Sequence, residues 1–185
     1  MAGPSRTRWG WHRLDRHWAG LLVADAGVGP GDLVVDVGAG SGALTVPLVA
    51  AGARVIAVEL HPDRARRLRH EFRGRPVTVV EADAADLRLP RRPFRVVANP
   101  PFAVTTALVR RLLAPGSRLV AADLVVPRYV ARRWVGPGAP GRARWTRSFT
   151  VSTGRTVPRR ALHPPPPCDA VVLVVRRRPG TLPRP

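Results

Sequence analysis

The sequence lacks lysine, has one cysteine and carries only 12 acidic residues among its 185. The single cysteine, Cys168, cannot form an internal disulfide and has no partners at metal-ligand spacing, which excludes a disulfide framework and a zinc site. No run of about 18 consecutive apolar residues exists, and the first residues carry charge and Trp where a signal peptide needs an apolar stretch. We therefore expect a cytoplasmic, metal-free protein without a membrane segment.

The positive charge of the chain comes from arginine alone. The 31 basic residues leave a formal net charge of +19 and a pI near 12.0. Such an excess attracts polyanions, and arginine pairs with phosphate through two hydrogen bonds and stacks on bases. A GC-rich coding bias explains the choice of Arg over Lys, but it does not explain the sign of the net charge. Nucleic acid is therefore the expected partner.

Short apolar runs alternate with helical patterns along most of the chain. Apolar residues recur at steps of three and four from Leu14 to Ala26, which predicts an amphipathic helix that Gly27 ends. Buried strands are predicted at residues 33–37, 54–59, 77–81, 94–98 and 118–126. Further helices are predicted up to residue 51 and at residues 62–73, 104–113 and 128–135. Strands separated by helices indicate a parallel sheet.

The C-terminal part of the sequence has a different pattern. Residues 148–153 and 170–176 are strand-like runs joined by a Pro-rich loop without a helix, which predicts an antiparallel pair at the edge of the sheet. Residues 136–141 are predicted to form a flexible loop, and residues 179–185 a disordered tail. The expected fold is a single α/β domain with a seven-stranded, mostly parallel sheet and an antiparallel C-terminal strand pair.

A glycine-rich loop, Gly38-Ala39-Gly40-Ser41-Gly42, follows the first predicted strand. Missing side chains there let a ligand approach the backbone and the N–H groups of the following helix. Glu59, at the tip of the second strand, has the spacing of a carboxylate that accepts hydrogen bonds from both ribose hydroxyls. Together they predict half of an adenosine site and favour a methyltransferase. The loop departs from G-x-G-x-x-G, which weakens the alternative of a dinucleotide cofactor without excluding it.

Asp83 follows the third predicted strand and has two interpretations. Its carboxylate can accept a hydrogen bond from the exocyclic amine of a bound adenine. Taken alone, an Asp at a strand end more often caps the turn that follows.

The segment Asn99-Pro100-Pro101-Phe102 follows the fourth predicted strand, at the sheet edge where a methyl donor would lie. Two prolines stiffen the loop, and rigidity suits a site that must hold an amine in line with a sulfonium methyl. The Asn99 amide oxygen and a backbone carbonyl can accept both protons of an adenine N6 amine, while Phe102 stacks on the base. The alternative is a proline-stiffened loop with a core Phe.

In this order, the glycine loop, Glu59, Asp83-Ala84 and the Asn-Pro-Pro-Phe segment resemble class I S-adenosylmethionine-dependent methyltransferases, specifically the Erm and KsgA group of ribosomal RNA adenine methyltransferases. The likeness covers about residues 10–178. It implies a Rossmann-like catalytic domain over residues 1–178, in which residues 1–13 close over S-adenosylmethionine. The implied activity is N6 methylation of an adenine in 23S rRNA, which in this family confers macrolide, lincosamide and streptogramin B resistance.

The resemblance also assigns residues. Those implied for the cofactor are His12, Leu14, Gly38, Ala39, Gly40, Glu59, Leu60, Asp83, Ala84 and Asn99. Those implied for the transfer are Asn99, Pro100 and Phe102. We expect a monomer that acts on ribosomal RNA.

Three departures from the family pattern change the expectations. The Gln-Asn-Phe-Leu-like opening is replaced by Gly10-Trp11-His12-Arg13-Leu14, so we expect cofactor binding with altered affinity. Ser41 stands where the loop usually has an acidic or apolar residue, which is a mild change. The small helical domain that generally follows the last strand is not expected, which reduces the RNA-binding surface.

Arginines of the later half are the predicted RNA-binding residues, because their segments are expected near the carboxyl edge of the sheet. The set is Arg110, Arg111, Arg128, Arg132, Arg133, Arg142, Arg144 and Arg147. We expect the loop from Gly136 to Arg147 to clamp phosphates. The arginines of residues 64–69 lie on an earlier helix and are interpreted as a solvated face.

Two other functions fit parts of the pattern. An enzyme of the same fold acting on a DNA adenine or a protein glutamine would also use Asn-Pro-Pro-aromatic, although the charge favours RNA. A non-catalytic RNA-binding or ribosome-assembly factor is suggested by the altered opening segment with Trp11, but intact Asn99 and Glu59 argue against it.

Overall fold

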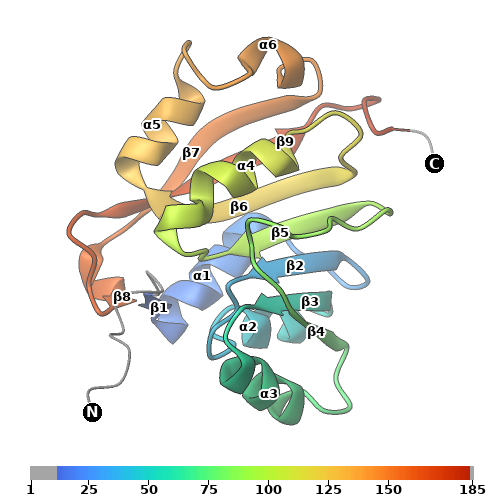
Figure 1. The fold of residues 1–185 in the computed structure, drawn as a ribbon, viewed down its shortest axis with the longest axis vertical. Coiled ribbons are helices and arrows are strands. Elements are labelled where there is room, and N and C mark those ends of the chain that lie inside the picture. The colour runs from blue at the N-terminus through green and yellow to red at the C-terminus, as the bar shows by residue number, and fades with distance from the viewer. Residues whose placement is uncertain (1–11, 184–185) are drawn as a thin grey trace.

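A seven-stranded sheet forms the centre of the computed structural model, which describes residues 12–183 (Figure 1). The strand order is β4-β3-β2-β5-β6-β9-β7. The five mutually parallel strands are β2 (Leu33–Val37), β3 (Arg54–Glu59), β4 (Val77–Glu81), β5 (Phe94–Ala98) and β6 (Leu119–Pro127). Strand β9 (Ala170–Arg177) runs antiparallel to β6 and to β7 (Phe149–Val157). The predicted fold class is confirmed. We call the end of the sheet where the parallel strands begin the amino edge, and the end where they stop the carboxyl edge.

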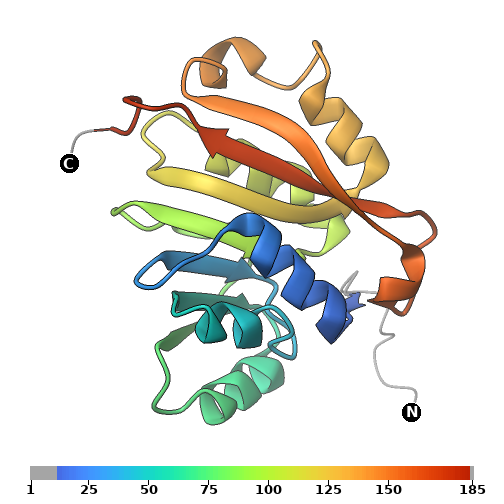
Figure 2. The same ribbon diagram turned by 180° about the vertical axis from the view of Figure 1, so that it is seen from behind.

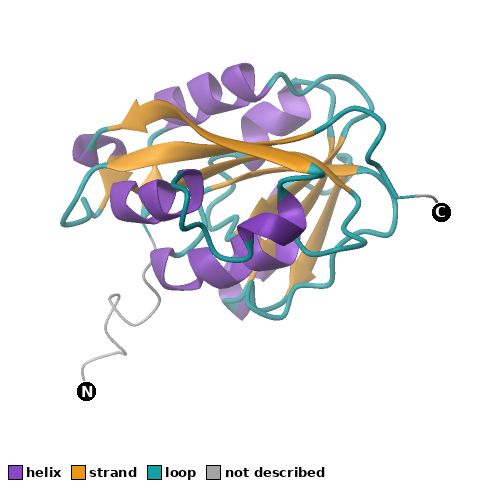
Figure 3. Ribbon diagram, turned by 90° about the horizontal axis from the view of Figure 1, so that it is seen from above, coloured by secondary structure: helices purple, strands orange, loops and turns teal. Residues whose placement is uncertain are grey.

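Helices cover both faces of the sheet, because its central strands are apolar on both sides. One face carries α1 (Arg16–Ala26), α2 (Thr45–Ala50) and α3 (Pro62–Glu71), as Figure 2 shows. The other carries α4 (Thr105–Leu112) and α5 (Arg128–Val135), and the view from above shows the sheet between the two layers (Figure 3). The short helices η2 (Phe102–Val104), α6 (Arg142–Trp145) and η3 (Arg159–Ala161) lie in connections. No described helix has the length and apolar character needed to cross a membrane.

The crossover from β4 to β5 differs from the others, because residues 82–93 form no helix. Pro90 and Pro93 remove backbone donors there, and Asp83 and Asp86 favour turns. The apolar face of β3 beneath this loop is therefore only partly covered, and Ile56 on that face stays partly exposed.

A small second sheet joins the beginning of the described chain to the segment between β7 and β9. Strand β1 (Arg13–Leu14) pairs antiparallel with β8 (Leu162–His163), and the Asp15 N–H donates to the Ala161 carbonyl at 2.8 Å. The sequence analysis missed this pairing, because strands of two residues carry no detectable alternation. The predicted helix from Leu14 accordingly begins at Arg16, with Asp15 as its N-cap accepting from the His17 N–H.

Two predictions for the C-terminal part need correction. The segment predicted as a flexible loop is a hydrogen-bonded turn, because the Trp145 indole donates to the Pro140 carbonyl at 3.0 Å and packs on Trp134. The tail predicted to be disordered from residue 179 is placed as far as residue 183, and the Thr181 hydroxyl donates to the Arg178 carbonyl at 2.7 Å. Residues 184–185 lie outside the described residues.

Candidate active site

The glycine loop after β2 is held against β3 and against the loop that follows β5. The N–H groups of Gly38 and Ala39 both donate to the Val58 carbonyl, at 2.8 and 3.0 Å. Gly38 has φ of +75°, and a Cβ there would lie 3.0 Å from Cδ of Pro101. Only glycine combines that backbone conformation with so close an approach. The predicted cofactor loop and the Asn-Pro-Pro segment are therefore in direct contact.

Glu59 at the end of β3 is buried and holds the glycine loop in place. Its two carboxylate oxygens accept from the backbone N–H groups of Gly40 and His61, each at 2.8 Å. Arg64 adds a longer contact of 3.8 Å. Each carboxylate oxygen has a second lone pair, so Glu59 can still accept from ribose hydroxyls. Leu60, the next residue, is 40% exposed at the same edge.

Asp36, at the end of β2, is a buried carboxylate that the sequence analysis did not select. It lines a small cavity of about 20 Å³ together with Gly38, Ser41 and Asn99, and the Thr45 hydroxyl donates to it at 2.7 Å. Burial is the main reason that its pKa rises to about 7, and the charge of Glu59 raises it further, while the Thr45 hydrogen bond opposes the rise. A cationic ligand in this cavity would favour the ionised form. An Asp at the end of an otherwise apolar strand was the available signal.

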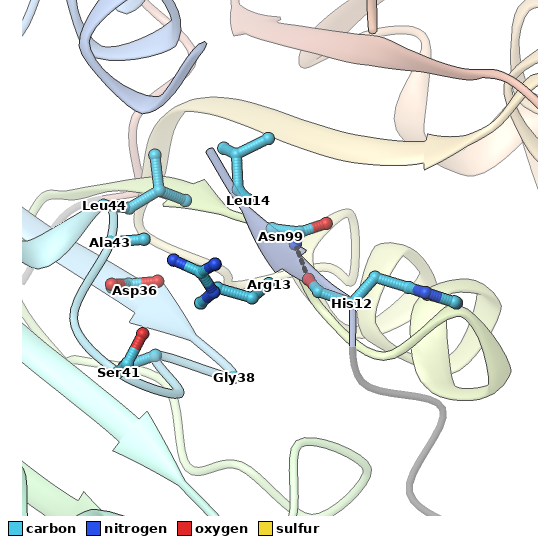
Figure 4. A pocket seen from close by; sticks show the side chains of 10 residues that line it. His12, Arg13, Leu14, Asp36, Gly38, Ser41, Ala43, Leu44 and Asn99 are labelled. Carbon is cyan, nitrogen blue, oxygen red and sulfur yellow. Dashed lines mark hydrogen bonds between the residues drawn. The ribbon is translucent and has the colours of Figure 1, made fainter. Parts of the chain in front are cut away.

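Asn99 is fixed by the segment that begins the described chain. Its side-chain amide Nδ2 donates to the His12 carbonyl at 2.6 Å (Figure 4). Because the side-chain NH₂ group is engaged in this way, the amide oxygen is the atom that can accept a hydrogen bond from a target amine. Pro100, which follows Asn99, is buried, and the ring of Phe102 lies 5.1 Å from the His12 ring at a tilt of 42°.

The side chains of residues 12–14 point to alternate sides, as expected for an extended segment. His12 turns away from the cavity, where its Nδ1–H donates to the Pro164 carbonyl at 2.6 Å, and the Leu14 side chain is buried in the core. Arg13 between them extends toward Asp36 and the glycine loop (Figure 4). The alternation of side chains along an extended segment could have identified Arg13 from the sequence as the residue that faces the cavity. The rest of the predicted cofactor-covering segment, residues 1–11, lies outside the described residues.

Asp83 and Ala84 lie one strand further along the carboxyl edge. Glu59 and Glu81 are paired in register, so the residues after β4 stand beside the end of β3. The exposed carboxylate of Asp83 accepts from the Ala85 N–H at 2.8 Å, which is the turn-capping arrangement, and Ala84 packs into the core. The structure therefore brings His12, Leu14, Gly38, Ala39 and Asn99 to one cavity, and Asp83 and Ala84 are not among its lining residues.

The predicted RNA-binding arginines do not all lie at the carboxyl edge. Helix α5 begins there with Arg128 and runs back along the sheet, so the segment after it lies at the amino edge. Phe149, which starts β7, pairs with Arg177, and Arg176 pairs with Ala121 near the start of β6. Arg142, Arg144 and Arg147 precede Phe149 and are exposed at the amino edge, which corrects the expected position. Arg110 and Arg111 close α4, and Arg111 donates to the Ala85 carbonyl at 2.6 Å.

An exposed aromatic residue accompanies the arginines of α5. Tyr129 is 67% exposed, and Arg128, Arg132 and Arg133 surround it in the sequence of the same helix. Aromatic rings between arginines are suited to stacking on unpaired bases. The pattern Arg-Tyr-x-x-Arg-Arg was the signal in the sequence, although only its arginines were predicted to bind RNA.

Comparison with known proteins gives relatives of two kinds. An rRNA adenine N-6-methyltransferase of Corynebacterium diphtheriae is 40% identical over 134 residues, covering 71% of this chain and 52% of the relative. The mycinamicin-resistance protein MyrB of Micromonospora griseorubida is 40% identical over 139 residues, covering 73% of this chain and 43% of MyrB. A ribosomal RNA small subunit methyltransferase A of Thermosynechococcus vestitus is 36% identical, covering 93% of this chain and 71% of the relative. The chain thus spans about half the length of the first two relatives.

The solved structures include close matches to the whole fold. The crystal structure of the 23S rRNA methyltransferase ErmE superposes with a TM-score of 0.81 at 29% identity, over 95% of this chain and 72% of ErmE. The family model for ribosomal RNA adenine dimethylases matches residues 15–184, which include every element of the site from α1 onward. The chain belongs to the ribosomal RNA adenine dimethylase family.

Proposed function

We propose that this protein transfers a methyl group from S-adenosylmethionine to the N6 amine of an adenine in 23S rRNA. The observation that carries the proposal is the contact of the glycine loop with the Asn-Pro-Pro segment, in which Gly38 lies against Pro101 and the Asn99 amide is oriented by the His12 carbonyl. This arrangement puts the acceptor for a target amine beside the loop that would hold the methyl donor.

The side chains around the glycine loop fit S-adenosylmethionine chemically. Glu59 is a buried carboxylate suited to ribose hydroxyls, Asp36 is one suited to an ammonium group, and Arg13 is a cation suited to a carboxylate. The backbone at Gly38 and Gly40 admits close approach of a ligand. When bound, S-adenosylmethionine supplies a methyl group on a positively charged sulfur, which needs no activation by an acid.

The residues of the chain would hold and orient the target amine. The Asn99 oxygen and the Pro100 carbonyl would accept hydrogen bonds from the two N6–H groups, which draws the nitrogen lone pair out of conjugation with the purine. Phe102, which already makes a ring contact with His12, stacks on the base. After transfer, the proton leaves the amine for solvent, because the methylated nitrogen is a strong acid until it loses a proton. No side chain with a raised pKa is needed for this step.

The RNA would be bound by the arginines around the carboxyl edge, with Arg128, Arg132 and Arg133 of α5 beside the exposed Tyr129. We include Arg110, Arg111, Arg142, Arg144 and Arg147 as more distant contacts to the backbone. The name of ErmE, a 23S rRNA methyltransferase, supports 23S rRNA as the substrate. The name of MyrB, a mycinamicin-resistance protein, supports antibiotic resistance as the consequence of methylation. The relatives named small subunit methyltransferase A support small-subunit rRNA as a second candidate substrate.

The test is a labelling experiment with tritiated cofactor. Protein-free 23S rRNA, assembled ribosomal subunits of both sizes, DNA and total protein are offered separately, and the labelled nucleoside is identified by chromatography. We expect label in N6-methylated adenosine of 23S rRNA, and none with the Asn99→Ala protein. Label confined to the small subunit would move the substrate to the second candidate. No label in any sample, with no cofactor binding by calorimetry, would overturn the proposal in favour of a binding factor.

A further inference from the structure

A second pocket, separate from the candidate active site, lies at the amino edge of the sheet. Its volume is about 690 Å³, and its walls come from the β4–β5 crossover, the end of α4 and the turn before β6. Arg118, in that turn, directly precedes β6, and its carbonyl accepts from the Phe94 N–H at the start of β5. The pocket therefore faces the end of the sheet opposite to the glycine loop and Asn99, so neither the cofactor nor the target adenine would occupy it.

The charged residues that line this pocket are all arginines. They are Arg88, Arg91, Arg111 and Arg118, and no carboxylate is among the lining residues. None of the four forms an ion pair within residues 12–183. Asp86 lines the adjoining cavity, and Arg111 donates to the Ala85 carbonyl at 2.6 Å. Positive charges around one pocket without a counter-charge repel one another, and an anion in the pocket would relieve that repulsion.

Arg118 has a donor that is buried without a partner. Its Nε–H is inaccessible to solvent and makes no hydrogen bond within the described part of the chain. Arg177 lies beside it, and burial together with the positive charge of Arg118 lowers the pKa of the Arg177 guanidinium. Arg177 donates to the carbonyls of Ser117, Leu119 and Thr181. It therefore stabilises the turn before β6 and adds positive charge beside Arg118. An unpartnered buried N–H is costly, so a rearrangement of the Arg118 side chain that brings this donor to an acceptor in the pocket is favoured.

We propose that this pocket binds a phosphate group. Arginine presents a planar fork of donors that matches phosphate oxygens, and several arginines around one pocket suit a group with more than one negative charge. Apart from Ser117, the remaining lining side chains are apolar, including Leu87, Leu89 and Pro115, and none provides an aromatic ring for a base. The phosphate itself is therefore the recognised group, and it comes either from an RNA backbone or from free phosphate or a nucleotide.

The test compares the wild type with two pocket variants and one control variant. Arg88→Gln/Arg91→Gln removes two exposed charges from the pocket, and Arg118→Gln removes the buried donor. The control is Arg67→Gln/Arg73→Gln, which removes two exposed charges beside the opposite face of the sheet. Pyrophosphate binding is measured by calorimetry at constant ionic strength, and binding of a 23S rRNA fragment is measured over a range of salt concentrations. Methyl transfer is not used, so the outcome is independent of the proposed function.

We expect the wild-type and control proteins to bind pyrophosphate, and the pocket variants to lose about tenfold or more in affinity. If the salt slope of RNA binding also falls by about 1 to 2 in Arg88→Gln/Arg91→Gln relative to the control, the source is the RNA backbone. If only pyrophosphate binding falls, the source is free phosphate or a nucleotide. Pyrophosphate binding that is absent from the wild type, or equal in the exposed-pair variant, overturns the proposal. Arg88 and Arg91 are exposed, so we expect the Arg88→Gln/Arg91→Gln variant to fold. This variant therefore tests the proposal even if Arg118→Gln does not fold.

Discussion

The two edges of the sheet are built in opposite ways. At the carboxyl edge, the three polar side chains of the candidate site are each held by the chain: Glu59 accepts from Gly40, Asp36 accepts from Thr45, and Asn99 donates to His12. At the amino edge, arginines line a pocket that has no carboxylate among its lining residues, and the Arg118 Nε–H has no partner in the described chain. The first edge is preorganised by the chain itself, which suits precise chemistry. We expect the second to be completed by the phosphate group proposed above, which suits recognition of a polyanion.

The largest expected effect is on the carboxyl edge, from Asn99→Ala. Removing the amide should lower methyl transfer by about 1,000-fold, because the variant cannot hold the target nitrogen against the methyl donor. The fold should be nearly unchanged, since Asn99 is only partly buried. Single-turnover transfer and circular dichroism measure the two effects. Full activity in a folded variant would show that the site lies elsewhere.

The charge of Asp36 makes that edge sensitive to pH. The folded protein keeps a proton on Asp36 up to about pH 7, whereas the unfolded chain loses it near 3.8. The folded state therefore binds more protons in this window, so the Asp36 contribution to stability falls as pH rises from about 4 to about 7, by on the order of 4 kcal/mol. Below the window and above it the contribution is constant.

Asp36→Asn isolates this contribution, because Asn can still accept from Thr45. We expect the difference in unfolding free energy between wild type and variant to change with pH in the direction given, as measured by urea unfolding from pH 4 to 8. The affinity of the wild type for S-adenosylmethionine should rise with pH up to about 7, since a cationic ligand favours the ionised carboxylate. Parallel stability curves for the two proteins would contradict the assignment.

A smaller effect is expected from Gly38→Ala. A side chain at φ of +75° costs about 1–2 kcal/mol, and its Cβ would press on Pro101, so both the melting temperature and methyl transfer should fall. Gly20→Ala is the matched control, because Gly20 lies inside α1 with nothing within 4 Å of its added Cβ. The control should gain about 0.5–1 kcal/mol through helix propensity. A Gly38 variant that behaves like the control would show that the close approach of Gly38 to Pro101 does not constrain the site.

The smallest expected effect is on the salt dependence of RNA binding, which allows arginines of the two edges to be compared directly. Neutralising Arg142, Arg144 and Arg147 at the amino edge should reduce the salt slope of binding by about 2, if each contacts one phosphate. The matched variant neutralises Arg128, Arg132 and Arg133 on α5, with the same change of net charge. Filter binding across salt concentrations separates the two. An unchanged slope in the first variant would exclude Arg142, Arg144 and Arg147 from the RNA footprint.

The parallel half of the fold was predictable because local pattern and tertiary position agree there. Strands β2 to β5 occur at the predicted residues, since buried central strands are continuous apolar runs bounded by turns. The glycine loop and the Asn-Pro-Pro segment were placed together because both follow parallel strands, whose ends meet at one edge. The direct contact between the two segments at Gly38 could be seen only in the structure.

The missed features depend on contacts that are far apart in sequence or too short to have a period. Helix α6 has four residues and is anchored by Trp145, and β1 has two residues whose partner is β8. The position of Arg142 and its neighbours depends on the direction in which α5 runs, which composition does not reveal. Asp36 lies two residues before the glycine loop, but its burial, which raises its pKa, becomes evident only when α2 and the segment around Arg13 are placed beside it.

The pairing of β1 with β8 has a consequence for how the protein matures. The carbonyl that orients Asn99 belongs to His12, and the His12 ring is tied to Pro164, 152 residues later in the chain. Contacts of such high sequence separation form late, because the entropy of closing the long intervening segment must be overcome first. During synthesis, a nascent chain would assemble its parallel strands well before it could fix the Asn99 amide. Competence for chemistry would therefore be acquired only after the segment around Pro164 has been synthesised and has paired with the residues around His12.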